Sequence, residues 1–204
     1  MKTSFDADKH EYTINGRPVP SVTEIIAEMM QPIFWNSTPE HLQNGTAVHA
    51  WAAAVARQRD VTAPDEVAGF VAAARKFLDD CVVEIVDIEH RMYSEVYQFA
   101  GTCDLIARTR FTAVRGAKCI IDYKATLTRL SDSQLGGYSI LDGSDINYGM
   151  AVQLNKNGSY QLGNVIDLRR FRGTFHGLRI AYAEKARLGL LTRKQNKKPE
   201  EQVA

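Results

Sequence analysis

Residues 117–126 read A117-K-C-I-I-D-Y-K-A-T126, and this stretch decides the fold. The continuous apolar run Cys119, Ile120 and Ile121 predicts a central strand that is buried on both faces. Residues two apart on a strand point to the same side, so Asp122 and Lys124 should project together near the strand's end. Asp-x-Lys also arises by chance as a solvated ion pair, but its place after a buried run favours a functional pair.

A second carboxylate lies upstream in the stretch G101-T-C-D-L-I-A107, which also reads as a strand. If the two strands pair, Asp104 and Asp122 converge. Two carboxylates held together repel one another unless a cation lies between them, and Mg²⁺ prefers such hard oxygen ligands. Lys124 beside that cation could orient or deprotonate an attacking water, or stabilise charge on a phosphate.

The N-terminal half is predicted to be mainly helical after a hairpin. The hairpin turns at Asn15-Gly16, and the prolines of R17-P-V-P20 should end it. Ser21 and Glu24 have the spacing of a capping box and predict the start of a helix. Two further helices are expected over residues 39–59 and about 64–80.

The second half predicts a sheet. Residues 81–109 read as two or three strands, and a helix should begin at Ser131. A second hairpin is expected to turn at Asn157-Gly158, and a last helix to span about 168–189. We therefore predict one α/β domain over residues 1–192, in which helices flank a mixed central sheet of three or so strands. The basic tail 193–204 has too few apolar residues to repay the entropy of ordering and is expected to be disordered.

Composition narrows the function classes. The 204 residues are 45% hydrophobic and 24% charged, without a long apolar segment or a secretory signal, so we expect a soluble cytoplasmic protein with no membrane partner. Three dispersed cysteines argue against disulfides and structural zinc, and no phosphate-cradling GxxxxGK[ST] motif suggests ATP use. The net charge is only +1, yet residues 165–204 carry +6 and the rest −5, which favours a phosphate-contacting surface beside a carboxylate-rich site.

Four short motifs follow one another in a recognisable order. They are G45-T-A-V-H49, G101-T-C-D104, D122-Y-K124 and Q134-L-G-G-Y138. In this order the chain resembles RecB-like exonucleases of the PD-(D/E)XK superfamily, whose fold is the restriction-endonuclease-like core. The opening P20-S-V-T-E-I-I26 is similar to phage and prophage members. The resemblance covers roughly residues 12–190.

This resemblance implies a DNA nuclease that depends on Mg²⁺ or Mn²⁺, with exonuclease action favoured. Asp104 and Asp122 would bind the metal together with the backbone carbonyl of Tyr123. His49 would be a further metal ligand, and Lys124 the catalytic lysine. Glu95, on the strand before GxxD, matches an acidic position near the metals. Residues implied to contact nucleic acid are Gln134 and Tyr138 of QxxxY, and Arg169, Arg170 and Arg172 of the basic terminal helix.

The resemblance has limits that leave alternatives open. The four cysteines of the iron–sulfur members are missing, so no cluster is expected. DNA is the expected partner, with a phage recombination or replication protein and a bacterial host cytoplasm as the setting. A catalytically silent DNA-binding or protein-binding module on the same fold is the alternative. In that case His49, Glu95, Gln134 and Tyr138 are ordinary helix and strand residues. DNA against RNA, end against internal cleavage, polarity and oligomeric state stay open.

Overall fold

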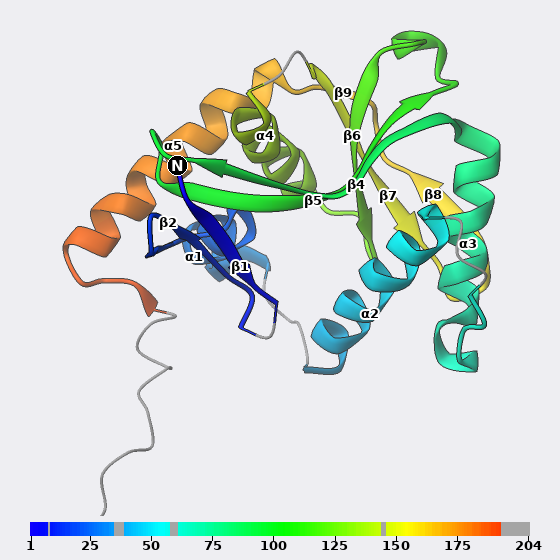
Figure 1. Cartoon of the computed structure of the whole chain (residues 1–204), viewed down its shortest axis with the longest axis horizontal. Helices are drawn as coiled ribbons and strands as arrows, with labels where there is room; N and C mark the ends of the chain where they lie inside the picture. The colour runs from blue at the N-terminus through cyan, green and yellow to red at the C-terminus, as the bar shows by residue number, and fades with distance from the viewer. Residues whose placement is uncertain (8, 35–38, 58–60, 144–145, 193–204) are drawn as a thin grey trace, which may run out of the picture.

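The computed structural model describes residues 1–7, 9–34, 39–57, 61–143 and 146–192, with side chains left undescribed at 31–34, 39–47, 112 and 142. The predicted tail at 193–204 lies outside these residues. Within the described part, no helix is both long enough and apolar enough to cross a membrane. The chain is α/β, with a mixed sheet flanked by helices and a small antiparallel sheet at the N-terminus (Figure 1).

The central sheet has six strands on the described residues, not three or so. Its order is β4-β5-β6-β7-β8, with β9 pairing to β7. The extra strands come from the second predicted hairpin, which turns where expected and joins the same sheet. Its first strand lies parallel to β6 because a crossover helix, α4, returns the chain to the same end of the sheet. The bounds are β4 Val82–Ser94, β5 Phe99–Thr109, β6 Lys118–Lys124, α4 Leu130–Asp142, β7 Tyr148–Leu154, β8 Tyr160–Leu162 and β9 Ile166–Asp167.

Strand β6 is the centre of the molecule, as its apolar run predicts. It lies between β5 and β7, and Ile120 and Ile121 are fully buried. Ile121 and Tyr123 face a core built with α2 and α3, whereas Ile120 faces a second core built with α1, α4 and α5. Figure 1 shows α2 and α3 on one side of the sheet and α4 and α5 on the other. The helix bounds are α1 Val22–Phe34, α2 Pro39–Ala56, α3 Asp65–Cys81 and α5 Arg169–Arg187.

The N-terminal hairpin is confirmed and extended into a three-stranded sheet. Asn15 and Gly16 both have positive φ, 52° and 77°, as a tight hairpin turn requires. Pro18 does not end the pattern, because it lies in an edge strand, where a missing N–H costs no ladder bond. Buried Tyr12 packs with Ala100 of β5 and so attaches this sheet to the main one. The strands are β1 Thr3–Asp6, β2 Glu11–Ile14 and β3 Arg17–Val19.

Helix α1 begins where the sequence predicts, with half of the expected capping box. The backbone N–H of Glu24 donates to Ser21 Oγ at 3.0 Å, which satisfies one open donor of the first turn. The Glu24 carboxylate instead accepts a hydrogen bond of 2.8 Å from the hydroxyl of Tyr182 on α5. The contact with α5 therefore takes the Glu24 carboxylate, which in a complete capping box would accept a hydrogen bond from the backbone N–H of Ser21.

Two glycines allow α4 to pack closely between the sheet and α5. A Cβ atom at Gly136 would lie 2.7 Å from the backbone oxygen of Phe171. At Gly137 it would lie 2.8 Å from Phe175 and from Val22. Both distances are shorter than real Cβ contacts, so only glycine fits at this crossing. The glycine pair inside Q134-L-G-G-Y138 thus fixes the depth at which α4 lies against its neighbours.

We predict that Gly136→Ala lowers the free energy of unfolding by about 1–3 kcal/mol, because the new methyl group meets a backbone atom that cannot move aside. Gly173→Ala on α5 is the matched control. A Cβ there meets nothing within 4 Å, so helix propensity should make it neutral or stabilising by up to about 1 kcal/mol. Denaturant unfolding of the two variants measures both values. Equal effects would contradict the packing argument.

Candidate active site

The antiparallel pairing of β5 and β6 places two carboxylates side by side. The register pairs Leu105 with Ile121, and the next residues beyond this pair are Asp104 and Asp122. Both are buried, with 8% and 1% of their surface exposed. The structure therefore brings together the two acids on which the sequence argument depends.

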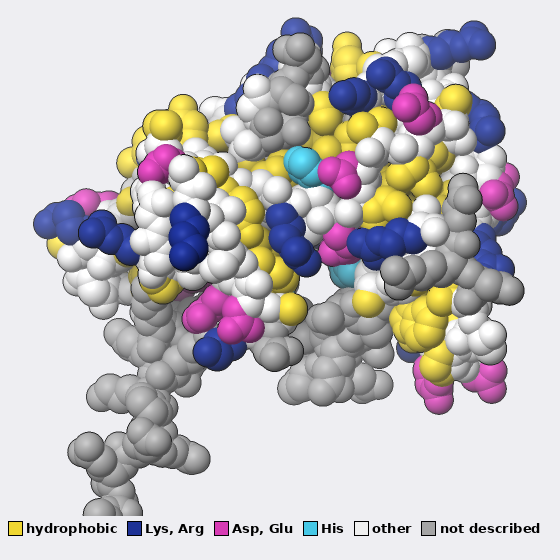
Figure 2. Space-filling model, viewed as in Figure 1, with side chains coloured by type: hydrophobic (Ala, Val, Ile, Leu, Met, Phe, Trp, Pro, Cys, Tyr) yellow, Lys and Arg dark blue, Asp and Glu magenta, His cyan; other side chains and the backbone are white. Residues whose placement is uncertain are grey.

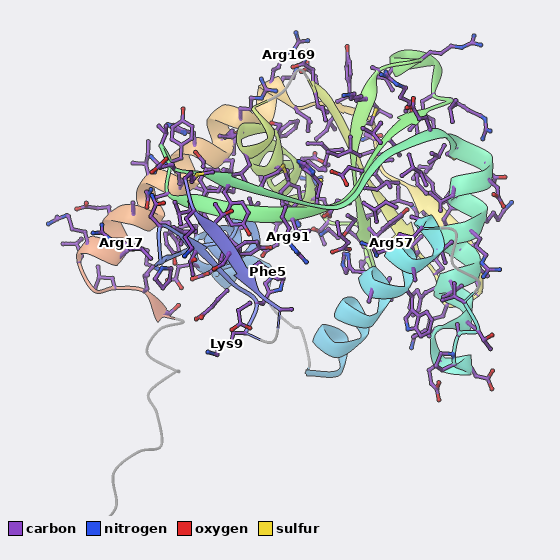
Figure 3. The ribbon with its side chains drawn as sticks, in the orientation of Figure 1. Phe5, Lys9, Arg17, Arg57, Arg91 and Arg169 are labelled. Atoms are coloured by element: carbon purple, nitrogen blue, oxygen red, sulfur yellow. The ribbon has the colours of Figure 1, made fainter. Side chains whose placement is uncertain are left out.

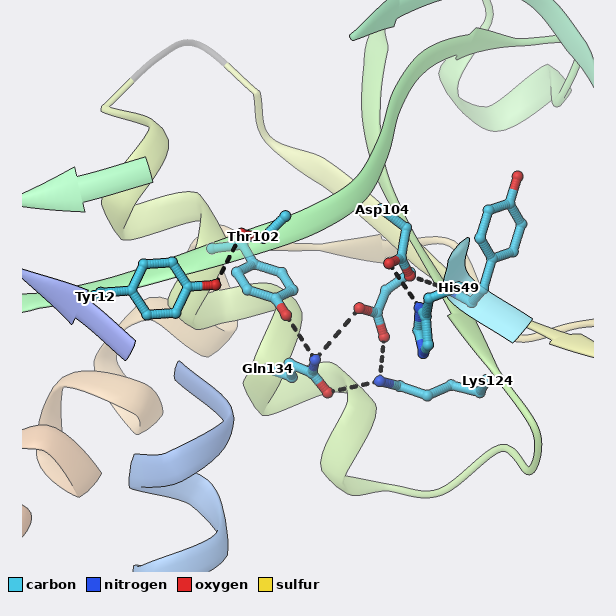
Figure 4. A network of polar contacts seen from close by, with 9 residues as sticks. Tyr12, His49, Thr102, Asp104, Lys124 and Gln134 are labelled. Atoms are coloured by element: carbon cyan, nitrogen blue, oxygen red, sulfur yellow. Dashed lines mark hydrogen bonds and ion pairs between the residues drawn. The ribbon is translucent and has the colours of Figure 1, made fainter. Parts of the chain in front are cut away.

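Asp104 is held by one backbone donor and one histidine. Its Oδ2 accepts a hydrogen bond of 2.6 Å from the backbone N–H of Tyr123, and its Oδ1 lies 2.7 Å from Nδ1 of His49 on α2 (Figure 4). Burial disfavours a charged His49, but the negative charge and hydrogen bond of Asp104 outweigh it and raise the pKa of His49. In this contact the imidazolium form of His49 can donate from Nδ1 to the Asp104 oxygen, which explains why the carboxylate favours the charged ring.

Asp122 is held by Lys124 and by the side-chain amide of Gln134 on α4. Lys124 Nζ lies 2.5 Å from Asp122 Oδ2 and donates to Gln134 Oε1 at 2.8 Å. The Gln134 amide nitrogen donates to Asp122 Oδ1 at 3.3 Å and to the hydroxyl oxygen of Tyr138 at 2.7 Å. These four contacts form one network in Figure 4. The amide of Gln134 therefore connects the lysine, the carboxylate and the tyrosine of two separate motifs.

The surroundings of Asp122 disfavour the charged form of its carboxyl group. Burial is the main cause that raises the pKa of Asp122, and the neighbouring Asp104 raises it further, while Lys124 opposes both. Among the described residues, the partner of Asp122 Oδ2 is the ammonium group of Lys124, which takes up one of the two lone pairs of this oxygen. One buried carboxylate oxygen is thus left with capacity for a further positive partner.

The glycine of G101-T-C-D104 has a packing role that links it to the last motif. A Cβ atom at Gly101 would lie 3.0 Å from Cε1 of Tyr138 and 3.1 Å from Val22. The missing side chain therefore leaves room for the Tyr138 ring against β5. Because Tyr138 in turn contacts Gln134, this glycine helps to set the position of the amide that holds Lys124.

These side chains line a cleft of about 410 Å³. Within the described residues, no group of three or more His, Cys, Asp and Glu side chains forms a ready-made metal site. Mg²⁺ does not need one, since it is usually bound by one or two carboxylates and completes its shell with waters and substrate phosphates. The second lone pair of Asp122 Oδ2 and the adjacent carboxylate of Asp104 therefore fit such an ion.

Glu95 lies outside the cleft. It follows the end of β4, in the exposed turn before β5, and accepts a hydrogen bond of 2.8 Å from the Asn15 amide. The acid that lies near the carboxylates is Glu89, which lines the cleft from β4 between the pairs Ile88–Leu105 and His90–Cys103. Burial, followed by the charge of Asp104, raises the pKa of Glu89.

Sequence reasoning missed Glu89 for a structural reason. Strand β4 contains two register shifts, between Val82 and Glu84 and between Ile85 and Asp87, which break its alternation. Glu89 itself has a positive φ of 54°, which residues other than glycine rarely adopt. A simple period of two therefore cannot assign its direction. The signal available in the sequence was only its position on the strand that precedes GxxD.

The arginines of the terminal helix also lie away from the cleft. Arg169 pairs with Asp167 at 2.7 Å, and Figure 3 shows it at the top of the view, away from Phe5 and Arg91 near the middle. Arg172 donates to Ser139 Oγ at 3.0 Å and to a backbone oxygen, so it joins α5 to α4. Arg170 is exposed and does not line the cleft. The structure therefore does not place these three residues with the carboxylates.

Comparison with known proteins adds little. No protein-family model matches the chain, and no curated protein matches it. Among solved structures, a crystal structure described as a "putative exonuclease" from Eubacterium rectale is similar over 91% of each chain. The TM-score is 0.48 and the sequence identity 10%, so this likeness is too distant to carry an argument about function.

We predict that Asp122→Asn makes the metal-free protein more stable at neutral pH, with a melting temperature about 2–4 °C higher for each 1 kcal/mol gained. The pKa of Asp122 is higher in the folded than in the unfolded protein. The folded state therefore has its full stability only below the unfolded pKa of about 3.9, and part of that stability is lost as the pH rises through the folded pKa. The asparagine side chain has no charge at any of these pH values, so the Asp122→Asn variant avoids this loss of stability. Thermal unfolding should also show that Mg²⁺ stabilises the wild type more than the variant. A variant less stable than wild type without metal would contradict the charge argument.

Proposed function

We propose that the chain is a metal-dependent nuclease of the RecB-like PD-(D/E)XK type that hydrolyses phosphodiester bonds in DNA. One observation carries this proposal. The four motifs are far apart in sequence, but residues from each of them line one cleft. Direct contacts join His49 to Asp104, and Gln134 to Lys124 and Asp122. A chance likeness of short motifs would not predict that they converge on two buried carboxylates.

In this proposal Asp104 and Asp122 would hold Mg²⁺ or Mn²⁺, with the backbone carbonyl of Tyr123 and the imidazole of His49 as further ligands. The bound metal supplies Lewis-acid stabilisation of the negative charge that develops on the phosphate. Neither an iron–sulfur cluster nor ATP has a part in it. Exonuclease action and a role in phage recombination, replication or DNA processing extend the proposal from the family resemblance alone.

Lys124 is the proposed catalytic residue, and its contacts suggest how it acts. An ammonium group has three N–H donors. Asp122 Oδ2 and Gln134 Oε1 face two of them, which leaves the third for a phosphate oxygen or the attacking water. Gln134 is a positioning residue, because its amide fixes both the lysine and the carboxylate without reaching the reacting atoms itself.

The test of the proposed function is cleavage of end-labelled linear and closed circular DNA, single- and double-stranded, with Mg²⁺, Mn²⁺ or EDTA. We predict metal-dependent loss of linear DNA that falls by at least about a hundredfold in Lys124→Ala, since a preorganised donor to developing charge is typically worth that much. Sparing of circles would identify an exonuclease. Binding to DNA without cleavage at high protein concentration would replace this proposal with a silent DNA-binding module.

A second test separates the two acids of the β4 region. We predict that Glu89→Gln lowers the cleavage rate roughly 10–100-fold, as expected for a group that supports the metal-binding carboxylates. Glu95→Gln makes the same chemical change in the exposed turn and should stay within about twofold of wild type. The measurement is the initial rate at saturating Mg²⁺. If Glu95→Gln lowers the cleavage rate more than Glu89→Gln does, Glu95 and not Glu89 is the acid that supports the site.

A further inference from the structure

We propose that the cleft takes an unpaired nucleic-acid strand, and that Arg91, Phe5 and His10 form a subsite for a base next to the scissile phosphate. The inference rests on the proposed nuclease function and goes further by naming the class of substrate. It comes from residues of the cleft lining that lie outside the four motifs.

The three residues lie together at the cleft mouth. Phe5 comes from β1, His10 precedes β2, and Arg91 projects from β4 (Figure 3). The guanidinium carbon of Arg91 lies 4.7 Å from the centre of the Phe5 ring, and the His10 ring meets Phe5 edge-on with centroids 5.3 Å apart. All three line the same cleft as Asp104 and Asp122. The carboxylates and this aromatic–arginine group therefore face one substrate space.

Arg91 differs from the other cation of the cleft. Lys124 is committed to Asp122, whereas no carboxylate within the described ranges lies within ion-pair distance of exposed Arg91. Figure 2 shows Lys and Arg side chains beside acidic and histidine side chains in the middle of this face. A guanidinium is planar, keeps its charge and stacks on aromatic rings and on bases. Held against Phe5, that of Arg91 is available to a nucleotide.

The position of this group favours an unpaired strand over a duplex. Inside a duplex both faces of each base are covered by its neighbours, so a base must leave the stack before it can stack on a protein group. The carboxylates are almost fully buried, and the phosphate must reach them through a space of about 410 Å³.

The test measures binding, separately from cleavage. Fluorescence anisotropy would follow a labelled oligothymidylate and a labelled duplex on full-length Lys124→Ala protein in Ca²⁺. Arg91→Ala and Phe5→Leu should each weaken binding of the single strand by about tenfold and change duplex binding by less than twofold, as the loss of one base stack predicts. Phe5→Leu keeps apolar volume in place of the ring. Arg91→Lys keeps the charge but not the planar guanidinium, and its affinity for the single strand should still fall several-fold.

Arg17→Ala is the matched control, because Arg17 is an exposed arginine of the same N-terminal sheet and does not line the cleft (Figure 3). Its single-strand affinity should stay within twofold of that of the parent protein. If Arg91→Ala and Phe5→Leu also stay there while wild type cuts DNA, this inference alone fails. Equal losses on both oligonucleotides would reduce Arg91 to a general phosphate contact and overturn the unpaired-strand inference. If wild type neither binds nor cuts any nucleic acid, the proposed function itself fails.

Discussion

The burial of Asp104 and Asp122 beside one another is the constraint on which the rest of the structure depends. Two carboxylates in a low-dielectric interior repel each other and lose hydration, which is costly unless donors and cations surround them. The chain supplies His49 from α2, Lys124 from the same strand and Gln134 from α4. Helices on both sides of the sheet must therefore be fixed for these acids to remain in place.

Close packing supplies that fixation. Gly136 lets α4 approach the backbone of α5, and Gly101 leaves the space that the Tyr138 ring fills. Tyr138 then contacts the same amide that holds Lys124 and Asp122. Residues without any charge thus determine the geometry of the charged cluster, because side-chain amides direct their donors and acceptors only when their helix is at the right distance.

In the proposed function, a chain with a net charge of only +1 has to attract a polyanion. Several cations are used within the protein: Arg172 joins α5 to α4, and Lys185 pairs with buried Glu28. Arg91, in the cleft, contacts the Phe5 ring and forms no such ion pair with the described residues. In the proposed function, attraction of the substrate depends on where a few cations lie and on the bound metal, rather than on overall charge.

The sequence by itself determined the features that local chemistry specifies. The apolar run before Asp122 identifies the central strand, Asn15-Gly16 and Asn157-Gly158 identify the hairpin turns, and Ser21 identifies the start of α1, because each acts over a few residues. The spacing of two between Asp122 and Lys124 likewise fixes their common face.

Only the tertiary structure decided which distant elements meet. It added the second hairpin to the central sheet, because the α4 crossover returns the chain parallel to β6. It placed Glu89 rather than Glu95 near Asp104, because Glu89 lies between the β4–β5 pairs that flank Asp104, whereas Glu95 falls in the turn after β4. It also used Arg172 for helix packing and brought Phe5 to Arg91, since both depend on contacts between segments that are far apart in sequence.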